Sequence, residues 1–491
     1  MPSSPGLLSR QYLPASIAIY TAVALVAFEG TAVAAALPQL AGDLGRLDLL
    51  PWAVTAYLFT SGVTTIMAGP LVDALGTRVI FRWAAVVFTV AGFSAGLATS
   101  MPVLIVIRLV QGAGSGLLLA CTLAAVGIIF PDRLAGRAFA ANSTIWGIMG
   151  VSAPAIAAFM LTTLSWRWIF FVNLPLGILS LIAGWRVLSG PQEGAETARM
   201  DWRGVLIIAS FTLSLLLSID RPGSASLGWM ALAAALLFAY GWHARRRDRP
   251  VVRLEHILSQ PYVGINAVAA LILMAALASN IYITLYVSAG RGGSATLTAW
   301  SVLWLTVGWT TGANVSSRML DRMADTSVMF AGAVAAVLGL GIAAPATLGN
   351  WPLPYVFAGL FVLGGGVGLS TNSALSLVRA STPPNRMGRA TAAYQFMRNQ
   401  GLTLGAATGG AVILFVVASR LGSVEPVQRL LAGEDIGITT EVAEAVQAGY
   451  AVAILVSLCL ALLAFIPLVL LRRMLAPARA ARRGGGGDES D

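Results

Sequence analysis

Apolar stretches of about 20 residues recur from one end of this chain to the other, and each is long enough to cross the hydrocarbon core of a bilayer as a helix. Of the 491 residues, 57% are apolar and 11% are charged, whereas a soluble domain carries roughly 25% charged residues. A soluble core would be interrupted by polar faces, and these runs are not. The sequence therefore predicts an all-α polytopic membrane protein.

Hydropathy and helix breakers predict fourteen spans, in residues 14–38, 51–72, 80–99, 103–130, 138–162, 168–188, 204–219, 227–243, 262–288, 297–317, 327–347, 353–377, 390–417 and 447–471. The first span is too long for the apolar region of a signal peptide and lacks a clear cleavage site, so we expect it to be retained. The seventh and eighth spans are the weakest, and twelve spans are the alternative.

The arginines fall in alternate loops. The chain has no lysine, its formal charge is +10, and arginines follow the even-numbered spans, for example at Arg82, Arg133, Arg245 and Arg379. Cytoplasmic loops carry such an excess of basic residues, so both termini are predicted to be cytoplasmic. The acidic loop in residues 421–447 is predicted to lie outside. Membrane topology thus explains the positive charge without nucleic acid.

A pattern of glycine, aspartate and arginine after span two has a partial second copy after span ten. Its members are Gly69, Asp73, Gly76 and Arg78 in the first copy and Arg318, Asp321 and Arg322 in the second. Small residues let helices approach, and an aspartate with an arginine at a membrane boundary can latch them together. A solvated loop is the alternative for the first copy. Repetition at matching points predicts two halves around a common site, the build of an alternating-access transporter.

Several further segments carry a family resemblance. They are residues 104–114 with Arg108, residues 165–175 with the sequence Trp-Arg-Trp-Ile-Phe, the span-five positions Gly147, Gly150 and Pro154, and residues 386–401. With residues 69–78, they resemble the major facilitator superfamily, specifically its fourteen-span drug:proton antiporter branch of the multidrug and quaternary-ammonium efflux type. The chain departs from the pattern at Ala74 and Thr77, where basic residues are frequent, and at Ala153, Ala157 and Ala158, where glycine is usual.

The resemblance implies a major facilitator fold with two six-helix bundles plus two extra linking helices. The expected domains are an N-terminal bundle in residues 1–188, two extra transmembrane helices with cytoplasmic linkers in 189–258, a C-terminal bundle in 259–475 and a disordered cytoplasmic tail in 476–491. Gly147, Gly150 and Pro154 are expected to bend span five.

Two ionisable residues, Glu29 and Arg108, lie deep within predicted spans. A charge at the bilayer centre costs at least ~2.5 kcal/mol, so each needs a function or a partner. We predict that Glu29 is the proton-coupling carboxylate, and the resemblance implies a relay role for Arg108. The alternatives are structural: Glu29 neutralises an arginine, or Arg108 binds carbonyls at a helix break. Arg398, near the start of span thirteen, is expected to snorkel to the inner face.

Aromatic and amide residues within the spans are candidates for lining a substrate cavity. They are Tyr57, Asn142, Trp146, Asn266, Asn280, Tyr282 and Gln395. An apolar cavity with a few hydrogen-bonding groups is the usual design of a small-molecule site. Each residue is alternatively a helix-packing residue or an interface anchor.

Other function classes find no support in the sequence. The glycine-rich runs at 112–116 and 364–368 lie inside apolar helices, without a preceding strand or a P-loop lysine, so they indicate close helix packing. Cys121 and Cys459 have no metal-binding pattern around them, and His243 and His256, beside an arginine-rich loop, are expected to be solvated. We predict no enzymatic activity, no cofactor and no metal.

The sequence and the resemblance together favour a secondary active transporter that exports small amphipathic compounds, such as drugs, antiseptics or natural products, by proton antiport through alternating access. The alternatives are a transporter of a specific metabolite with other coupling or direction, and a non-transporting membrane sensor. The expected location is the plasma membrane, in particular a bacterial cytoplasmic membrane. Protons, a small-molecule substrate and membrane lipid are the expected partners, and the resemblance implies a monomer.

Overall fold

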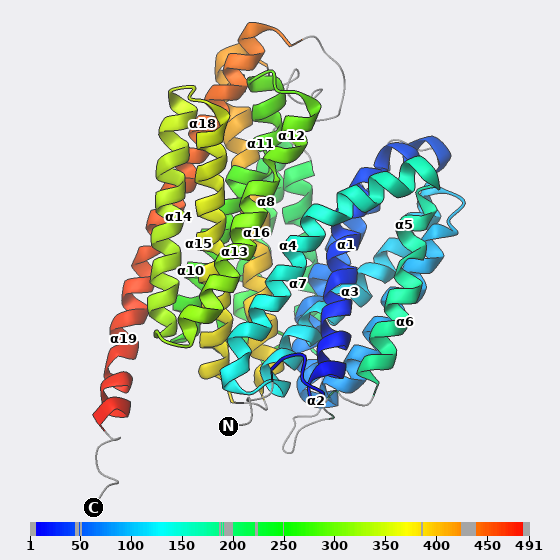
Figure 1. The fold of residues 1–491 in the computed structure, drawn as a ribbon, viewed down its shortest axis with the longest axis vertical. Coiled ribbons are helices and arrows are strands. Elements are labelled where there is room, and N and C mark those ends of the chain that lie inside the picture. Colours follow the sequence, from blue (N-terminus) through cyan, green and yellow to red (C-terminus); the bar gives the residue numbers. More distant parts are fainter. Residues whose placement is uncertain are drawn as a thin grey trace, which may run out of the picture.

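A computed structural model describes residues 6–44, 49, 52–185, 188, 190, 200–220, 224–248, 250–383, 386–423 and 438–484. Every regular element in these residues is helical, which confirms the all-α prediction. The helices form an N-terminal half, a connecting pair and a C-terminal half (Figure 1).

The N-terminal half begins with a long helix and a helix broken near its middle. Its described helices are α1 (Leu13–Leu44), α2 (Trp52–Gly96), α3 (Met101–Ile129), α4 (Asp132–Thr163), α5 (Arg167–Phe171) and α6 (Asn173–Gly184). α2 covers the second and third predicted spans, which are separated at Gly76, where φ is 79° and ψ is 160°. Only glycine adopts this conformation without steric cost, so Gly76 sets the break between the two spans.

The connecting pair and the C-terminal half follow. The described elements are α7 (Trp202–Asp220), α8 (Ser224–Arg245), the linker helix α9 (Glu255–Leu258), α10 (Tyr262–Asn280), α11 (Ile283–Leu285), the π-helix η2 (Tyr286–Gly290), α12 (Ala295–Ser301), α13 (Leu303–Leu320), α14 (Asp325–Leu348), α15 (Leu353–Ala380), α16 (Met387–Leu421), α18 (Thr440–Leu463) and α19 (Phe465–Gly484). α7 packs on α8 and also contacts α2 and α16, so the connecting pair touches both halves.

A buried carboxylate holds the connecting pair together. Asp201, just before α7, accepts a hydrogen bond from Gly204 N over 3.1 Å. Its two carboxylate oxygens also lie 3.0 Å from His243 Nε2 of α8. His243 is therefore partly buried at a helix contact, and the expectation that it is solvated is wrong because Asp201 binds it.

Glycine allows the closest helix contacts in both halves. A Cβ at Gly112 would lie 2.3 Å from Tyr57 O, where α3 packs along α2. A Cβ at Gly364 would lie 2.1 Å from Leu305 O, where α15 packs along α13. Both distances are well inside van der Waals contact, so these positions require glycine. The glycine-rich runs therefore serve helix packing, as predicted.

Ten of the described helices are long and apolar enough to cross a membrane, or eleven if the bent pair within α4 is one span. The difference from fourteen has identifiable sources. α2 is counted once although it covers two predicted spans, and α7 is apolar but shorter than the others. The pair α12 and α13 is interrupted, because the helix breaks between Ser301 and Leu303. The number of crossings stays a prediction.

The described chain begins and ends at one end of the helical bundle. α1 begins and α19 ends at the lower end in Figure 1, which we call the termini-side end, and the ribbons of the two halves diverge toward the opposite end. α19 continues to Gly484, so residues 476–484 are helical where a disordered tail was predicted. Alanine and arginine, which dominate this stretch, are strong helix formers. The rest of that predicted tail, 485–491, lies outside the described residues.

Candidate functional site

A buried ion pair joins α1 to α3 in the N-terminal half. Arg108 Nη1 donates to Glu29 Oε1, and the two side chains are 1% and 0% exposed. Asn173, the first residue of α6, donates from Nδ2 to Glu29 Oε2 over 2.8 Å. Each carboxylate oxygen therefore has a partner from a different helix. The fold thus brings together the two residues that the sequence singled out for proton coupling.

The guanidinium of Arg108 is held by three further groups. Its Nε donates to Ala53 O over 2.9 Å, and Nη1 donates to Gln111 Oε1 over 2.9 Å. The ring of Tyr57 lies 4.2 Å from the guanidinium carbon, within the range of a cation–π contact. These contacts fix the cation beside Glu29 whether or not the carboxylate is ionised.

Two amide groups in this cluster have spare hydrogen-bonding capacity. Gln111 Nε2 and Asn173 Oδ1 are buried and have no hydrogen-bond partner in the described part of the chain. Gly92 of α2 makes room for both amides, because a Cβ there would lie 3.0 Å from each amide nitrogen. Glu29, Arg108, Gln111 and Asn173 form what we call the carboxylate cluster. The cluster offers a donor to each oxygen of the Glu29 carboxylate and keeps an unused acceptor, Asn173 Oδ1, next to it.

Asp73 ties the N-terminal half to α16 of the C-terminal half. Its Oδ1 accepts from Gly388 N over 2.8 Å and its Oδ2 accepts from Arg389 N over 3.2 Å. Arg389 Nε lies 3.5 Å from Oδ2, and the Asp73 side chain is 5% exposed. Helix N-termini stabilise anions, so this placement favours the ionised carboxylate. Gly69 allows the approach, because a Cβ there would lie 2.9 Å from Ala392 Cβ.

The second copy of the repeated pattern also reaches the opposite half. Asp321, directly after α13, accepts from Arg137 Nη2 of α4 over 3.3 Å. Arg78 of the first copy donates from Nε to Leu188 O over 2.7 Å, a contact within the N-terminal half. Arg318, Asp321 and Arg322, the members of the second copy, are all exposed. One aspartate in each copy therefore contacts an arginine across the interface between the halves.

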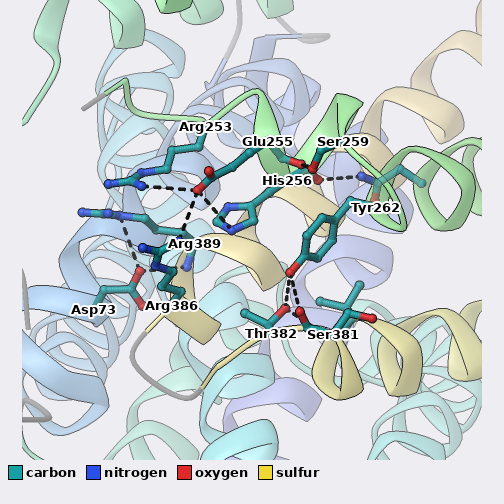
Figure 2. A network of polar contacts seen from close by, with 12 residues as sticks. Asp73, Arg253, Glu255, His256, Ser259, Tyr262, Ser381, Thr382, Arg386 and Arg389 are labelled. Carbon is teal, nitrogen blue, oxygen red and sulfur yellow. Dashed lines mark hydrogen bonds and ion pairs between the residues drawn. The ribbon is translucent and has the colours of Figure 1, made fainter. Parts of the chain in front are cut away.

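The linker helix α9 lies against the same end of α16 (Figure 2). Glu255 Oε1 lies 3.3 Å from Arg253 Nη1 and 3.9 Å from Arg386 Nη1. The ring of His256 meets the ring of Tyr262 edge-on, with centroids 5.1 Å apart. The pKa of the His256 imidazole is lowered to about 4, mainly by burial; Glu255 opposes this shift and the neighbouring arginines add to it. His256 is therefore buried and neutral near pH 7, and the expectation that it is solvated is wrong.

A family model described as Major Facilitator Superfamily matches residues 19–406, which include the carboxylate cluster and the Asp73 contact. The chain belongs to this superfamily. The motifs that carried the resemblance therefore identified the family correctly, and two packed halves are the arrangement that the family fold implies.

Similar proteins are transporters of the superfamily and not enzymes. An uncharacterised transporter from Mycobacterium tuberculosis is 27% identical over 82% of this chain, which spans about 60% of that relative's length. The multidrug transporter protein MdtP of Bacillus subtilis is 24% identical, over 79% of this chain and 72% of MdtP. Among solved structures, the human organic anion transporter MFSD10 matches with a TM-score of 0.64 at 13% identity, over 91% of this chain and 99% of MFSD10. This last likeness shows a common fold.

The span-five positions singled out by the superfamily pattern lie where α4 crosses α13. A Cβ at Gly147 would lie 1.7 Å from Thr310 Oγ1, and Gly150 faces the same helix. The axis of α4 turns by 40° at a break that contains Pro154. Proline removes one helix N–H and so favours a bend at this point. The glycines thus serve close contact between the halves, and Pro154 lies within the four-residue break at which the helix bends.

The seven cavity candidates have different surroundings. Tyr57 supports Arg108 in the carboxylate cluster. Asn266 donates from Nδ2 to His256 O over 2.9 Å, so it stabilises the linker helix rather than a central site. Tyr282 donates to Ala406 O over 3.3 Å. The other four lie in the spans, buried or partly buried, and are Asn142, Trp146, Asn280 and Gln395.

Sequence reasoning missed two contacts. Asn173 stands in a recognised motif, but the carboxylate that it binds is 144 residues away, and no local signal pairs them. Arg398 does not extend to the membrane surface as expected. Its guanidinium carbon lies 5.4 Å from the centre of the Trp309 ring of α13.

Proposed function

We propose that the protein is a secondary active exporter of small amphipathic compounds, working by proton antiport and alternating access in a bacterial cytoplasmic membrane. The observation that carries the proposal is the buried Glu29–Arg108 pair, because a carboxylate inside the membrane domain is a group that can bind and release a proton. The name of the multidrug transporter protein MdtP supports transport of drug-like compounds. The arginine alternation supports fourteen crossings with both termini in the cytoplasm.

The carboxylate cluster offers a hydrogen-bonded arrangement for each protonation state of Glu29. The ionised acid accepts from Arg108 and from Asn173. A protonated acid is also a donor, and Asn173 Oδ1, unpartnered in the described structure, is an acceptor beside it. Arg108 retains Ala53 O and Gln111 Oε1 in either state. Proton binding would therefore weaken the link between α1 and α3, because it removes the counterion of Arg108 and leaves that guanidinium with two neutral acceptor oxygens. The two protonation states thus favour different arrangements of the cluster, which is the requirement for a coupling site.

The contacts between the halves support a conformation closed at the termini-side end. Asp73 binds the start of α16, and Arg379 Nη2 of α15 donates to Phe130 O over 2.7 Å. With cytoplasmic termini, this conformation is outward-facing. Export would then begin when the contacts of Asp73 and Arg379 break, opening the site to the cytoplasm, and proton binding from outside would release the substrate and reset the cycle.

The experiment that tests this proposal measures proton-driven uptake of a panel of amphipathic dyes into everted membrane vesicles. Glu29→Gln removes the titratable proton, and we expect it to reduce gradient-driven transport at least tenfold, whereas Glu29→Asp retains part of it. Asp43→Asn is the matched control, because Asp43 is an exposed carboxylate near the end of the same helix. We expect it to transport normally. Full gradient-driven transport by Glu29→Gln would refute the coupling role.

A transporter of a specific metabolite is the second candidate. Ala153 and Ala157 are fully buried in α4 at positions where the antiporter branch usually has glycine, which weakens the analogy to that branch. Replacing the proton gradient by a sodium gradient, and the dye panel by polar metabolites, in vesicles of both orientations distinguishes the two candidates.

A further inference from the structure

Arg398 lies within α16 and not at its end. At 1.5 Å per residue, it is about 16 Å from the start of that helix at Met387, and the hydrocarbon core of a bilayer is about 30 Å thick. Trp309 lies at the same depth, because it is about 16 Å from the end of α13 at Leu320. α13 ends at the termini-side end and α16 begins there. Arg398 and Trp309 therefore lie at about the same distance from that end.

The surroundings of Arg398 leave its positive charge without a counterion. In the described chain, its guanidinium carbon lies 5.4 Å from the centre of the Trp309 ring, and no carboxylate lies within ion-pair distance. The residue is mostly buried but keeps some exposed surface. A guanidinium that is partly exposed and has no counterion within ion-pair distance in the described chain is available to an incoming ligand.

The charges deep within the described spans do not balance. Glu29, Arg108 and Arg398 are the three charged side chains there, and the first two neutralise each other in a fully buried pair. Arg398 remains as one uncompensated positive charge. A cationic substrate would therefore meet net repulsion and no free carboxylate, whereas an anionic substrate would supply the missing partner.

We propose that Arg398 and Trp309 form a substrate subsite that selects aromatic organic anions, such as carboxylates, sulfonates or phenolates. A guanidinium donates two parallel hydrogen bonds to a planar carboxylate, and the indole ring offers a face for stacking. The inference rests on the proposed export function and narrows its substrate class from amphipathic compounds to anionic ones. It replaces the cationic substrates that the quaternary-ammonium resemblance suggested.

The test compares an anionic and a cationic aromatic dye on the purified full-length protein. Fluorescein and ethidium binding are measured by fluorescence anisotropy at pH 7.5 or above, where fluorescein is anionic. Arg398→Gln removes the charge, Arg398→Lys keeps it, and Arg420→Gln is the matched control, since Arg420 is exposed at the other end of the same helix. We expect Arg398→Gln to weaken fluorescein binding at least tenfold while ethidium binding stays the same or tightens, and the control to leave both unchanged.

Three results would overturn the inference. They are wild-type protein that binds ethidium more tightly than fluorescein, wild-type protein that binds neither dye, and an Arg398→Gln variant with unchanged fluorescein affinity. If Arg398→Gln does not match the wild-type melting temperature, Trp309→Leu replaces it, and it must weaken fluorescein binding several-fold more than ethidium binding. Failure of the export proposal looks different: fluorescein binding would depend on Arg398, but no pH gradient would drive its transport.

Discussion

The contact between Asp73 and the start of α16 makes a quantitative prediction about the closed conformation. Asp73→Ala leaves the backbone N–H groups of Gly388 and Arg389 without the carboxylate that accepts from them, and it removes the ion pair with the Arg389 guanidinium. An unsatisfied buried donor costs about 1–3 kcal/mol, so we expect the closed state to lose about 2–4 kcal/mol in total. This corresponds to a shift of about 30- to 800-fold toward the state open at the termini-side end. Asp73→Asn keeps an acceptor oxygen but loses the charge at the helix N-terminus, and we expect it to destabilise the closed state by about 1–2 kcal/mol.

Spin labels on the two halves report this shift through the distribution of distances between them, measured by double electron–electron resonance. Arg133→Cys in α4 and Arg322→Cys after α13 are exposed sites on opposite halves, in a background without Cys121 and Cys459. We expect Asp73→Ala to move most of the population to longer distances.

The second copy of the motif provides the control for that measurement. Asp321 pairs with Arg137 at 3.3 Å, but the side chains are 40% and 57% exposed. Exposed ion pairs contribute about 0.2–1 kcal/mol, so Asp321→Ala is expected to shift the equilibrium by less than about fivefold. An unchanged distance distribution in Asp73→Ala, or an equal shift in both variants, would refute the reasoning that burial and the helix N-terminus give Asp73 its larger effect.

Two further predictions concern stability. The pKa of His256 is about 4 in the folded protein against about 6.5 when unfolded, so the unfolded chain takes up the proton first as pH falls. The contribution of neutral His256 to the free energy of unfolding is therefore fully present above pH ~6.5, and it declines by at most about 3 kcal/mol as pH falls toward 4. Melting curves of wild type and His256→Asn across this range test it, and a wild-type melting temperature that does not fall more steeply than that of the variant would contradict it. Gly92→Ala places a Cβ 3.0 Å from the amide nitrogen of Asn173, and we expect a loss of about 1–3 kcal/mol in thermal or denaturant unfolding together with reduced transport. Gly341→Ala, where a Cβ meets nothing within 4 Å, is the control and should be neutral or slightly stabilising; an equal loss in both variants would remove the packing argument.

The sequence by itself determined the class of the protein and much of its helical layout. Apolar length and arginine placement depend on the solvent around the chain, not on which helix packs on which, so they can be read without the fold. The break at Gly76 coincides with the predicted loop between spans two and three, because a positive φ is a local property of glycine. The motif around Arg108 and the repeated Asp73 and Asp321 loops identified the family for the same reason: they are contiguous in the chain.

Tertiary structure decided which of those residues meet. Glu29 and Asn173 are 144 residues apart and Asp73 lies 315 residues from Gly388, so their hydrogen bonds exist only after the helices pack. Burial was decided at the same level. His256 follows an arginine-rich loop yet is 4% exposed, and Arg398 faces Trp309 instead of the membrane surface. Which side chains pair, and which remain accessible to solvent, is set by helices that come from distant parts of the chain. For this reason only the folded structure shows that Arg108 has a counterion in Glu29 and that Arg398 faces an aromatic ring.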